Sequence, residues 1–211
     1  KIDVMTENPE AAQIVHGVDG VSQKLGSFNI KSWKKNLAML YLLFMAPLIA
    51  KGVKPPFLDA LKNKANIGPY LEADLIVSTG GQFITDIYFP SKVGILWEHY
   101  FCSLLDKKVA IYAQTLGPFD RPLYRFLTRY VLNRIDIITT RDQESKEILE
   151  SIGVETPIVF TADAAFSMSS YYERERPVSK LNSGAPELDG GYFSISARTW
   201  QHFNDSNGEE K

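Results

Sequence analysis

The feature that most constrains the fold of this chain is an alternation of short apolar segments with longer segments of helical periodicity. The expected strands are residues 2–5, 74–78, 108–113, 135–140, 157–161 and 192–197. Most of them are apolar on both faces and rich in β-branched residues, which is typical of strands buried in a parallel sheet. The expected helices are residues 56–64, 86–105, 121–133 and 142–152. The alternation predicts a doubly wound α/β layer with right-handed crossovers and helices on both faces of a parallel sheet.

Residues 169–190 interrupt this alternation. They combine two tyrosines, a charged run, two prolines and a Ser-Gly pair, and no apolar period survives there. Such a segment is typical of a linker or long loop. The strand expected at 192–197 follows it and cannot bury its own faces. We therefore expect a first domain over residues 1–168, a linker over 169–190 and the start of a second domain over 191–211.

Charge and cysteine content exclude several classes of protein. The chain has 23 Lys and Arg against 25 Asp and Glu, a net charge of −2, which argues against a general nucleic-acid binder. The one cysteine, Cys102, excludes an internal disulfide and a multi-cysteine metal site, and it fits a cytoplasmic location. Because Cys102 lies in an apolar helical stretch, we expect a buried thiol. His16, His99 and His202 lack the spacing of metal ligands, so we expect no metal site.

Residues 37–50 form an apolar run of 14 residues, LAMLYLLFMAPLIA. This is shorter than the ~20 residues needed to span a bilayer, and Pro47 interrupts it. A helix packed in the core or in an interface is the favoured interpretation. The alternative is contact with a membrane surface, because five lysines surround the run: Lys31, Lys34, Lys35, Lys51 and Lys54.

Two expected strands end in residues suited to binding a ligand. In open α/β sheets, ligands bind outside the carboxyl ends of the strands. Gly80 and Gly81 follow the strand at 74–78, and their amides could hold an anion, although a simple turn also explains two glycines. Gln114 and Thr115 follow the strand at 108–113 and offer donors and acceptors, or they simply build a loop.

Arginines follow two further strands. Arg141 follows the strand at 135–140 and Arg198 follows the strand at 192–197. The planar guanidinium fork suits a carboxylate or a phosphate, and a structural salt bridge is the alternative for Arg141. Asp142 is explained as a helix N-cap, whereas Asp163 follows the strand at 157–161 as a cap, turn or site residue. Two strand-end arginines predict a local anion site. Three other arginines fall on the face opposite an apolar stripe and are expected to be solvated: Arg121, Arg125 and Arg129.

The strand ends together resemble the polysaccharide pyruvyl transferase family. The matching stretches, in chain order, are DLIVSTGGQF (74–83), YAQTLGPF (112–119), ITTRDQES (138–145), FTADAAF (160–166) and SISARTW (194–200). No GxSxG, Walker A or GxGxxG pattern occurs, which argues against serine hydrolases, P-loop proteins and dinucleotide enzymes.

The resemblance implies two Rossmann-like domains that face each other across a cleft, as in a GT-B glycosyltransferase, with this chain as the N-terminal part. It implies transfer of a pyruvyl group from phosphoenolpyruvate to sugar hydroxyls of a surface polysaccharide or its lipid-linked precursor. No metal or further cofactor is expected. The family's opening strand is expected before Lys1 and its catalytic histidine after Trp200, and the oligomeric state stays open.

On this hypothesis the strand-end residues divide into two groups. Arg141 and Arg198 are expected to act in catalysis by holding the donor's negative charge. The expected substrate-binding residues are Gly80, Gly81, Gln114, Thr115 and Asp163. Two alternatives stay open, namely a nucleotide-sugar glycosyltransferase of the same shape and a non-catalytic carbohydrate- or anion-binding domain. The expected location is the cytoplasm, with the inner membrane surface as an alternative.

Overall fold

The structure is a computed structural model, and it describes residues 2–6, 10, 13, 21–23, 33–65, 67–89 and 93–168. The chain divides into two compact units, Lys1–Ala164 and Ala165–Lys211. Of the second unit, only residues 165–168 are described, as part of the 3₁₀ helix η2 (Ala164–Met168). The strand expected at 192–197, the linker and Arg198 lie outside the described residues. The expected domain boundaries and the GT-B-like architecture therefore stay predictions.

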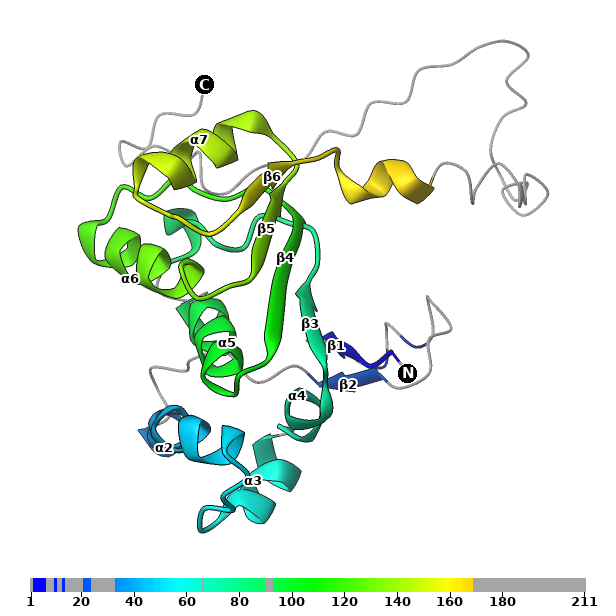
Figure 1. Cartoon of the computed structure of the whole chain (residues 1–211), viewed down its shortest axis with the longest axis vertical. Helices are drawn as coiled ribbons and strands as arrows, with labels where there is room; N and C mark the ends of the chain where they lie inside the picture. Colours follow the sequence, from blue (N-terminus) through cyan, green and yellow to red (C-terminus); the bar gives the residue numbers. More distant parts are fainter. Residues whose placement is uncertain are drawn as a thin grey trace, which may run out of the picture. The chain divides into compact units, whose positions relative to one another are not determined.

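A four-stranded parallel sheet forms the centre of the first unit (Figure 1). Its strands are β3 (Leu75–Ser78), β4 (Lys108–Gln114), β5 (Ile137–Thr140) and β6 (Ile158–Phe160), and they lie side by side in chain order. Each of the four was expected from its apolar, β-branched sequence, and the α/β class with a parallel sheet is confirmed. A separate two-stranded parallel sheet joins β1 (Val4–Thr6) to β2 (Val21–Gln23). The strand β2 was not expected.

Three crossover helices connect the four strands: α5 (Val93–Leu104), α6 (Pro122–Leu132) and α7 (Gln143–Ser151). Because the strand order follows the chain order, right-handed crossovers place all three helices on one face of the sheet, as Figure 1 shows. The opposite face leaves five large side chains exposed within the described residues: Leu75, Val77, Tyr112, Ile137 and Val159. Helices were expected on both faces of the sheet. Over the described residues they cover one face, so the prediction is confirmed for that face and wrong for the other.

Local sequence sets the ends of α6 and α7. Arg121 precedes α6 in an extended conformation and Pro122 occupies the first turn, where its missing N–H costs nothing. Asp142 caps α7 by accepting a hydrogen bond from the amide of Ser145 at 2.7 Å. Gly153, with φ of 84°, follows the end of α7 in the left-handed region. The helices expected over 121–133 and 142–152 are confirmed.

The helix expected over residues 86–105 is wrong in its first part. A short 3₁₀ helix, η1 (Asp86–Tyr88), comes first, and α5 begins at Val93. The reason is Pro90, because the residue before a proline is driven out of the helical region. Phe89 accordingly adopts φ −70° and ψ 138°. Within α5, Cys102 is buried, as the sequence predicted.

The apolar run forms α2 (Trp33–Ala50), which lies against α5. Met39, Leu42 and Ala46 are buried on one side of α2, which confirms the expected packed helix. Two shorter helices, α3 (Leu58–Ala65) and α4 (Gly68–Glu72), lead from α2 to β3. Over the described residues, no helix is long and apolar enough to cross a membrane.

Candidate functional site

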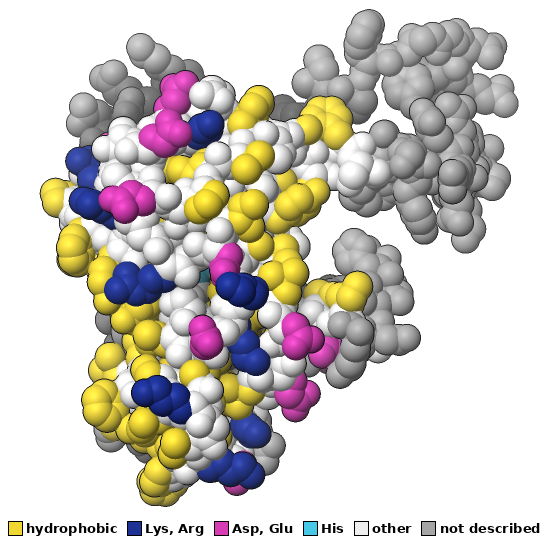
Figure 2. Space-filling view, viewed as in Figure 1, with side chains coloured by type: hydrophobic (Ala, Val, Ile, Leu, Met, Phe, Trp, Pro, Cys, Tyr) yellow, Lys and Arg dark blue, Asp and Glu magenta, His cyan; other side chains and the backbone are white. Residues whose placement is uncertain are grey.

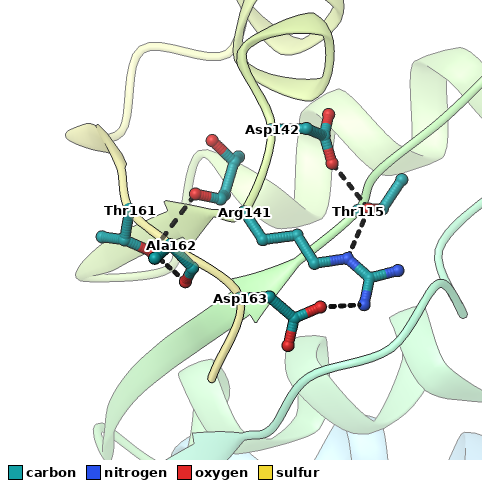
Figure 3. A network of polar contacts seen from close by, with 7 residues as sticks. Thr115, Arg141, Asp142, Thr161, Ala162 and Asp163 are labelled. Carbon is teal, nitrogen blue, oxygen red and sulfur yellow. Dashed lines mark hydrogen bonds and ion pairs between the residues drawn. The ribbon is translucent and has the colours of Figure 1, made fainter. Parts of the chain in front are cut away.

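Polar side chains from three neighbouring strand ends meet at the carboxyl edge of the four-stranded sheet (Figure 3). Thr115 follows β4, Arg141 follows β5 and Asp163 lies three residues after β6. Because parallel strands end at the same edge, the sheet brings together residues that are up to 48 positions apart in the chain. The sequence predicted all three as site residues, and the structure places them in one hydrogen-bonded network.

Thr115 is the centre of this network. Its hydroxyl accepts a hydrogen bond from Nε of Arg141 at 2.7 Å and donates one to Oδ2 of Asp142 at 2.6 Å. A hydroxyl has one proton to donate, so the carboxylate of Asp142 fixes the direction of this bond. Thr115 therefore holds one edge of the guanidinium in place.

Asp163 holds the Arg141 side chain at a second point. One of its carboxylate oxygens lies 2.6 Å from Nη1 of Arg141, and about a third of each side chain is exposed (31% and 35%). The amide of Thr161 donates to the carbonyl of Thr140 at 2.8 Å, which ties the chain after β6 to the end of β5. The salt bridge considered for Arg141 is present, and it orients the guanidinium at the sheet edge.

Asp142 has a wider role than the N-cap that the sequence predicted. Burial works to raise the pKa of its carboxyl group, but hydrogen bonds from Ser145 and Thr115 and the charge of Arg141 outweigh it. The net result is a pKa below the usual range. The carboxylate is therefore ionised at neutral pH and helps to hold Thr115. Ser145 adds a further link, since its hydroxyl accepts the amide of Leu116 at 2.8 Å.

A β-bulge sets the direction of Gln114. The pairing of β4 with β5 shifts between Ile111 and Gln114, and Ala113 adopts φ of 50°. Gln114 is 1% exposed, and its Nε2 donates to the carbonyls of Ser78 and Thr79 at 3.2 and 2.8 Å. Gln114 thus ties β4 to the end of β3. Its predicted contact with substrate stays a prediction.

The two glycines after β3 are explained by close packing. A Cβ on Gly80 would lie 3.3 Å from the carbonyl oxygen of Ala113. Gly81 has φ of 142°, and a Cβ there would lie 2.3 Å from the Phe83 ring. The carbonyl of Gly81 accepts the amide of Thr115 at 3.0 Å, so this loop positions the residue at the centre of the network. Anion binding by the Gly80 and Gly81 amides stays a prediction.

The network can present a guanidinium to an anion. Arg141 has five N–H groups, and the bonds to Thr115 and Asp163 engage two of its nitrogens, Nε and Nη1. Nη2 of Arg141 makes no hydrogen bond to any residue in the part of the chain that the structure describes. Asp142 and Asp163 offset the positive charge of this arginine. A strong anion site therefore needs a further cation, the role expected of Arg198.

A shallow pocket of about 480 Å³ lies at the ends of the loops that follow β3 and β4. It is lined by Asp86, Ile87, Pro118, Asp120, Arg121 and Pro122. The Asp86 carboxylate is largely buried and accepts the amide of Arg121 at 2.5 Å. Carboxylates beside apolar side chains suit hydroxyl-rich ligands. Asp86 was not predicted from the sequence as a site residue. Its place a few residues after Gly80 and Gly81 is the one signal that could have indicated it.

The arginines expected to be solvated are exposed, as predicted: Arg121, Arg125 and Arg129. The Arg121 guanidinium lies over the Phe89 ring, 5.1 Å from its centroid. His99 is buried, and its Nδ1 lies 2.6 Å from the carbonyl oxygen of Ile95. Within the described residues, no three His, Cys, Asp or Glu side chains are grouped as metal ligands would be. His16 and His202 lie outside those residues.

Comparison with known proteins agrees with the strand-end motifs. The family profile described as polysaccharide pyruvyl transferase matches residues 1–210. The chain is 33% identical over 95 residues to the amylovoran biosynthesis protein AmsJ of Erwinia amylovora. That alignment covers 44% of this chain and 22% of AmsJ, so the matched part spans about a fifth of the relative. No solved structure matches significantly. Because the family profile covers almost every residue, the chain belongs to the polysaccharide pyruvyl transferase family.

Proposed function

We propose that the full-length protein transfers a pyruvyl group from phosphoenolpyruvate to two hydroxyls of a carbohydrate acceptor. Both sugar oxygens bond to C2 of the donor, and C3 gains a proton to become a methyl group. The C2–O bond to phosphate breaks, and inorganic phosphate leaves with the second hydroxyl proton. The product is a pyruvate ketal that keeps its carboxylate, and the atoms balance without an oxidant or reductant.

The observation that carries this proposal is the position of Arg141. It extends from the end of β5, where α/β sheets bind ligands, and Thr115 and Asp163 hold it at two points. A guanidinium fixed in this way loses little conformational entropy when it binds a carboxylate or phosphate. Phosphoenolpyruvate carries both groups, so a pre-oriented arginine suits its recognition.

Charge arithmetic adds a requirement to the proposal. Asp142 and Asp163 both contact the Thr115–Arg141 network, so this half of the site carries no excess positive charge. We propose that Arg198 supplies the second cation and that the Gly80 and Gly81 amides supply further donors. The general acid that protonates C3 needs a tuned pKa, and we expect it in the C-terminal half of the full-length protein.

The acceptor sugar is proposed to bind in the shallow pocket lined by Asp86 and Asp120. Hydroxyl groups donate well to carboxylates, and Pro118, Pro122 and Ile87 offer an apolar surface for the ring. This pocket follows β3 and β4, and the Arg141 network follows β4 to β6. Donor and acceptor would therefore meet at one edge of the sheet. Asp120→Asn should raise the KM for the acceptor and leave the KM for phosphoenolpyruvate unchanged.

Ligand-induced stabilisation of the full-length protein tests the donor. Phosphoenolpyruvate should raise the thermal midpoint of the wild type, whereas nucleotide sugars should not. Arg141→Ala should abolish this stabilisation. Arg134→Ala is the matched control, because Arg134 follows the end of α6 and donates to the Tyr130 carbonyl of that helix.

Two results would refute the proposal. Stabilisation by a nucleotide sugar but not by phosphoenolpyruvate would favour the glycosyltransferase alternative. Sugar binding without turnover, with both donor and acceptor supplied, would favour a non-catalytic carbohydrate-binding domain. An unchanged phosphoenolpyruvate response in Arg141→Ala would remove this residue from the site.

A further inference from the structure

We propose that the exposed faces of α2 and α6 together form a surface that docks on an anionic membrane. This inference goes beyond the proposed function and does not rest on it. It is carried by exposed apolar side chains, by two sequence segments that contain cations and no acids, and by the position of the two helices on one side of the sheet. The surface is called the α2–α6 face below.

The outer side of α2 is apolar and exposed. Leu37, Leu40, Phe44 and Leu48 recur at intervals of three and four residues, so they form one stripe along the helix. Their exposed fractions range from 41% for Leu48 to 77% for Phe44. The opposite side of α2 is buried against the core at Met39, Leu42 and Ala46. The helix is therefore apolar on both sides, and only one side has a partner within the described residues.

The outer side of α6 has a similar character. Leu123, Phe126 and Tyr130 recur at i, i+3 and i+7, and Leu123 and Phe126 are more than 60% exposed. Exposed arginines lie among them, and the Arg134 guanidinium stacks 3.7 Å from the centroid of the Tyr130 ring. Large apolar side chains can enter the headgroup region of a membrane while long cationic side chains beside them reach the lipid phosphates.

The charge of both segments has one sign. Residues 31–54, which contain α2, include five lysines and no Asp or Glu. Residues 121–134, which contain α6, include four arginines and no Asp or Glu. The rest of the chain has 14 Lys and Arg against 25 Asp and Glu, so the near-neutral total conceals a strong asymmetry. Anionic lipids complement this concentration of cations.

The two helices are placed to act together. Both contact α5, and in Figure 1 both lie on the same side of the four-stranded sheet. Figure 2 shows yellow and dark blue side chains gathered over α2 at the bottom of the view and along the edge formed by α6. Lys51 and Lys54 are exposed just after the end of α2, next to the apolar stripe. A bilayer interface accepts such a surface, because apolar side chains enter the headgroup region while cations meet lipid phosphates.

Vesicle co-sedimentation of the full-length protein tests the proposal. Vesicles that contain phosphatidylglycerol should bind the wild type, vesicles of pure phosphatidylcholine should bind it weakly, and high salt should reduce binding. Leu40→Glu with Phe44→Glu should lower the partition coefficient by about tenfold or more, and so should Phe126→Glu. Lys51→Glu with Lys54→Glu should lower it by a similar factor, because two attractive charges become repulsive.

The chain offers a matched control for the apolar change. Leu75 in β3 is 57% exposed and Leu40 in α2 is 56% exposed, but Leu75 lies on the open face of the sheet. Leu75→Glu should therefore leave vesicle binding unchanged, and Lys107→Glu is the control for the lysine pair. Circular dichroism and the thermal midpoint establish that each variant is folded.

Three outcomes would overturn the proposal. Equal binding to anionic and neutral vesicles would remove the role of charge. Equal loss of binding in Leu75→Glu would show that any exposed apolar group suffices. A dimer in light scattering that becomes a monomer in Leu40→Glu with Phe44→Glu, without vesicle binding by the wild type, would assign the face to a second copy of the chain. None of these readouts depends on phosphoenolpyruvate, so failure here leaves the proposed function standing.

Discussion

Removal of the Asp142 carboxylate should destabilise the fold by about 2–3 kcal/mol. In Asp142→Ala, α7 loses its N-cap bond to the Ser145 amide, which contributes about 1 kcal/mol. The Thr115 hydroxyl also loses a charged acceptor at 2.6 Å, and hydrogen bonds to charged groups contribute roughly 1.5–3 kcal/mol. We take the low end for this second bond, because Asp142 is half-exposed and water can replace part of it.

Asp142→Asn separates the cap from the charge. Asparagine caps helices as well as aspartate does, so the bond to Ser145 should survive and the loss should be about 1.5 kcal/mol, the part assigned to the Thr115 bond. Urea unfolding followed by circular dichroism at pH 7 measures all three proteins. Equal stability of wild type and Asp142→Ala would refute the role given to this carboxylate.

The same carboxylate predicts a dependence on pH with a definite sign. The folded state lowers the pKa of Asp142, so its stabilising contribution is complete above the unfolded pKa of about 3.9. The contribution is lost as the pH falls through the lower, folded value. The difference in unfolding free energy between wild type and Asp142→Asn should therefore shrink as the pH falls below about 4. A difference that grows on acidification would contradict this account.

Three further predictions concern other contacts of the same domain. Gly117→Ala should lower the free energy of unfolding by about 1–3 kcal/mol, because Gly117 has φ of 94° and a Cβ there would lie 3.1 Å from the Ile148 side chain. Thermal unfolding measures this loss, and an unchanged midpoint would refute it. Leu149→Ala should lower the free energy of unfolding by roughly 2–5 kcal/mol, because this α7 side chain is fully buried. The urea midpoint should fall, and a loss below about 1 kcal/mol would contradict the packing. Hydrogen bonds from Lys108 and from the Val109 amide lower the pKa of Asp136, so Asp136→Asn should lose a small amount of stability at pH 7. That loss should vanish as the pH falls below about 4, and a loss that persists at pH 2 would have another cause.

The sequence predicted most of the sheet because its signals are local. Each of β3 to β6 is a short apolar, β-branched run, and Pro122 and Asp142 mark the starts of α6 and α7. The strand β2 (Val21–Gln23) and the helix α4 (Gly68–Glu72) were missed. Both are very short, and segments of three to five residues carry too little periodicity to stand out.

The candidate site was predicted in its members but not in its contacts. Thr115, Arg141 and Asp163 each follow a strand, so parallel pairing alone predicted that they would meet. Which atoms bond depends on register, and the bulge near Ala113 changes the register without any glycine to signal it. Gln114 is directed into the sheet edge instead of outward for the same reason. A local pattern cannot reveal a shift that depends on the neighbouring strand.

The charge asymmetry was hidden in a different way. The net charge of −2 is a property of the whole chain, and only the division into elements shows that α2 and α6 lie in segments without acids. The lysines around residues 37–50 were recognisable in the sequence as a group of cations beside an apolar run. The arginines of α6 were expected only to form a solvated face. Exposure of Leu123 and Phe126 among those arginines changes that interpretation.

Acceptor-dependent release of phosphate from phosphoenolpyruvate is the most direct test of the central claim. The full-length wild type should release phosphate only when a carbohydrate acceptor is present. Arg141→Ala should lose at least about a hundredfold in kcat/KM while it stays folded, because charge-assisted hydrogen bonds to the donor would be worth about 3 kcal/mol. Arg141→Lys should recover little, since a compact ammonium cannot replace the planar fork that Thr115 and Asp163 hold in place. Wild-type turnover in Arg141→Ala would contradict the assignment of this strand end as the donor site.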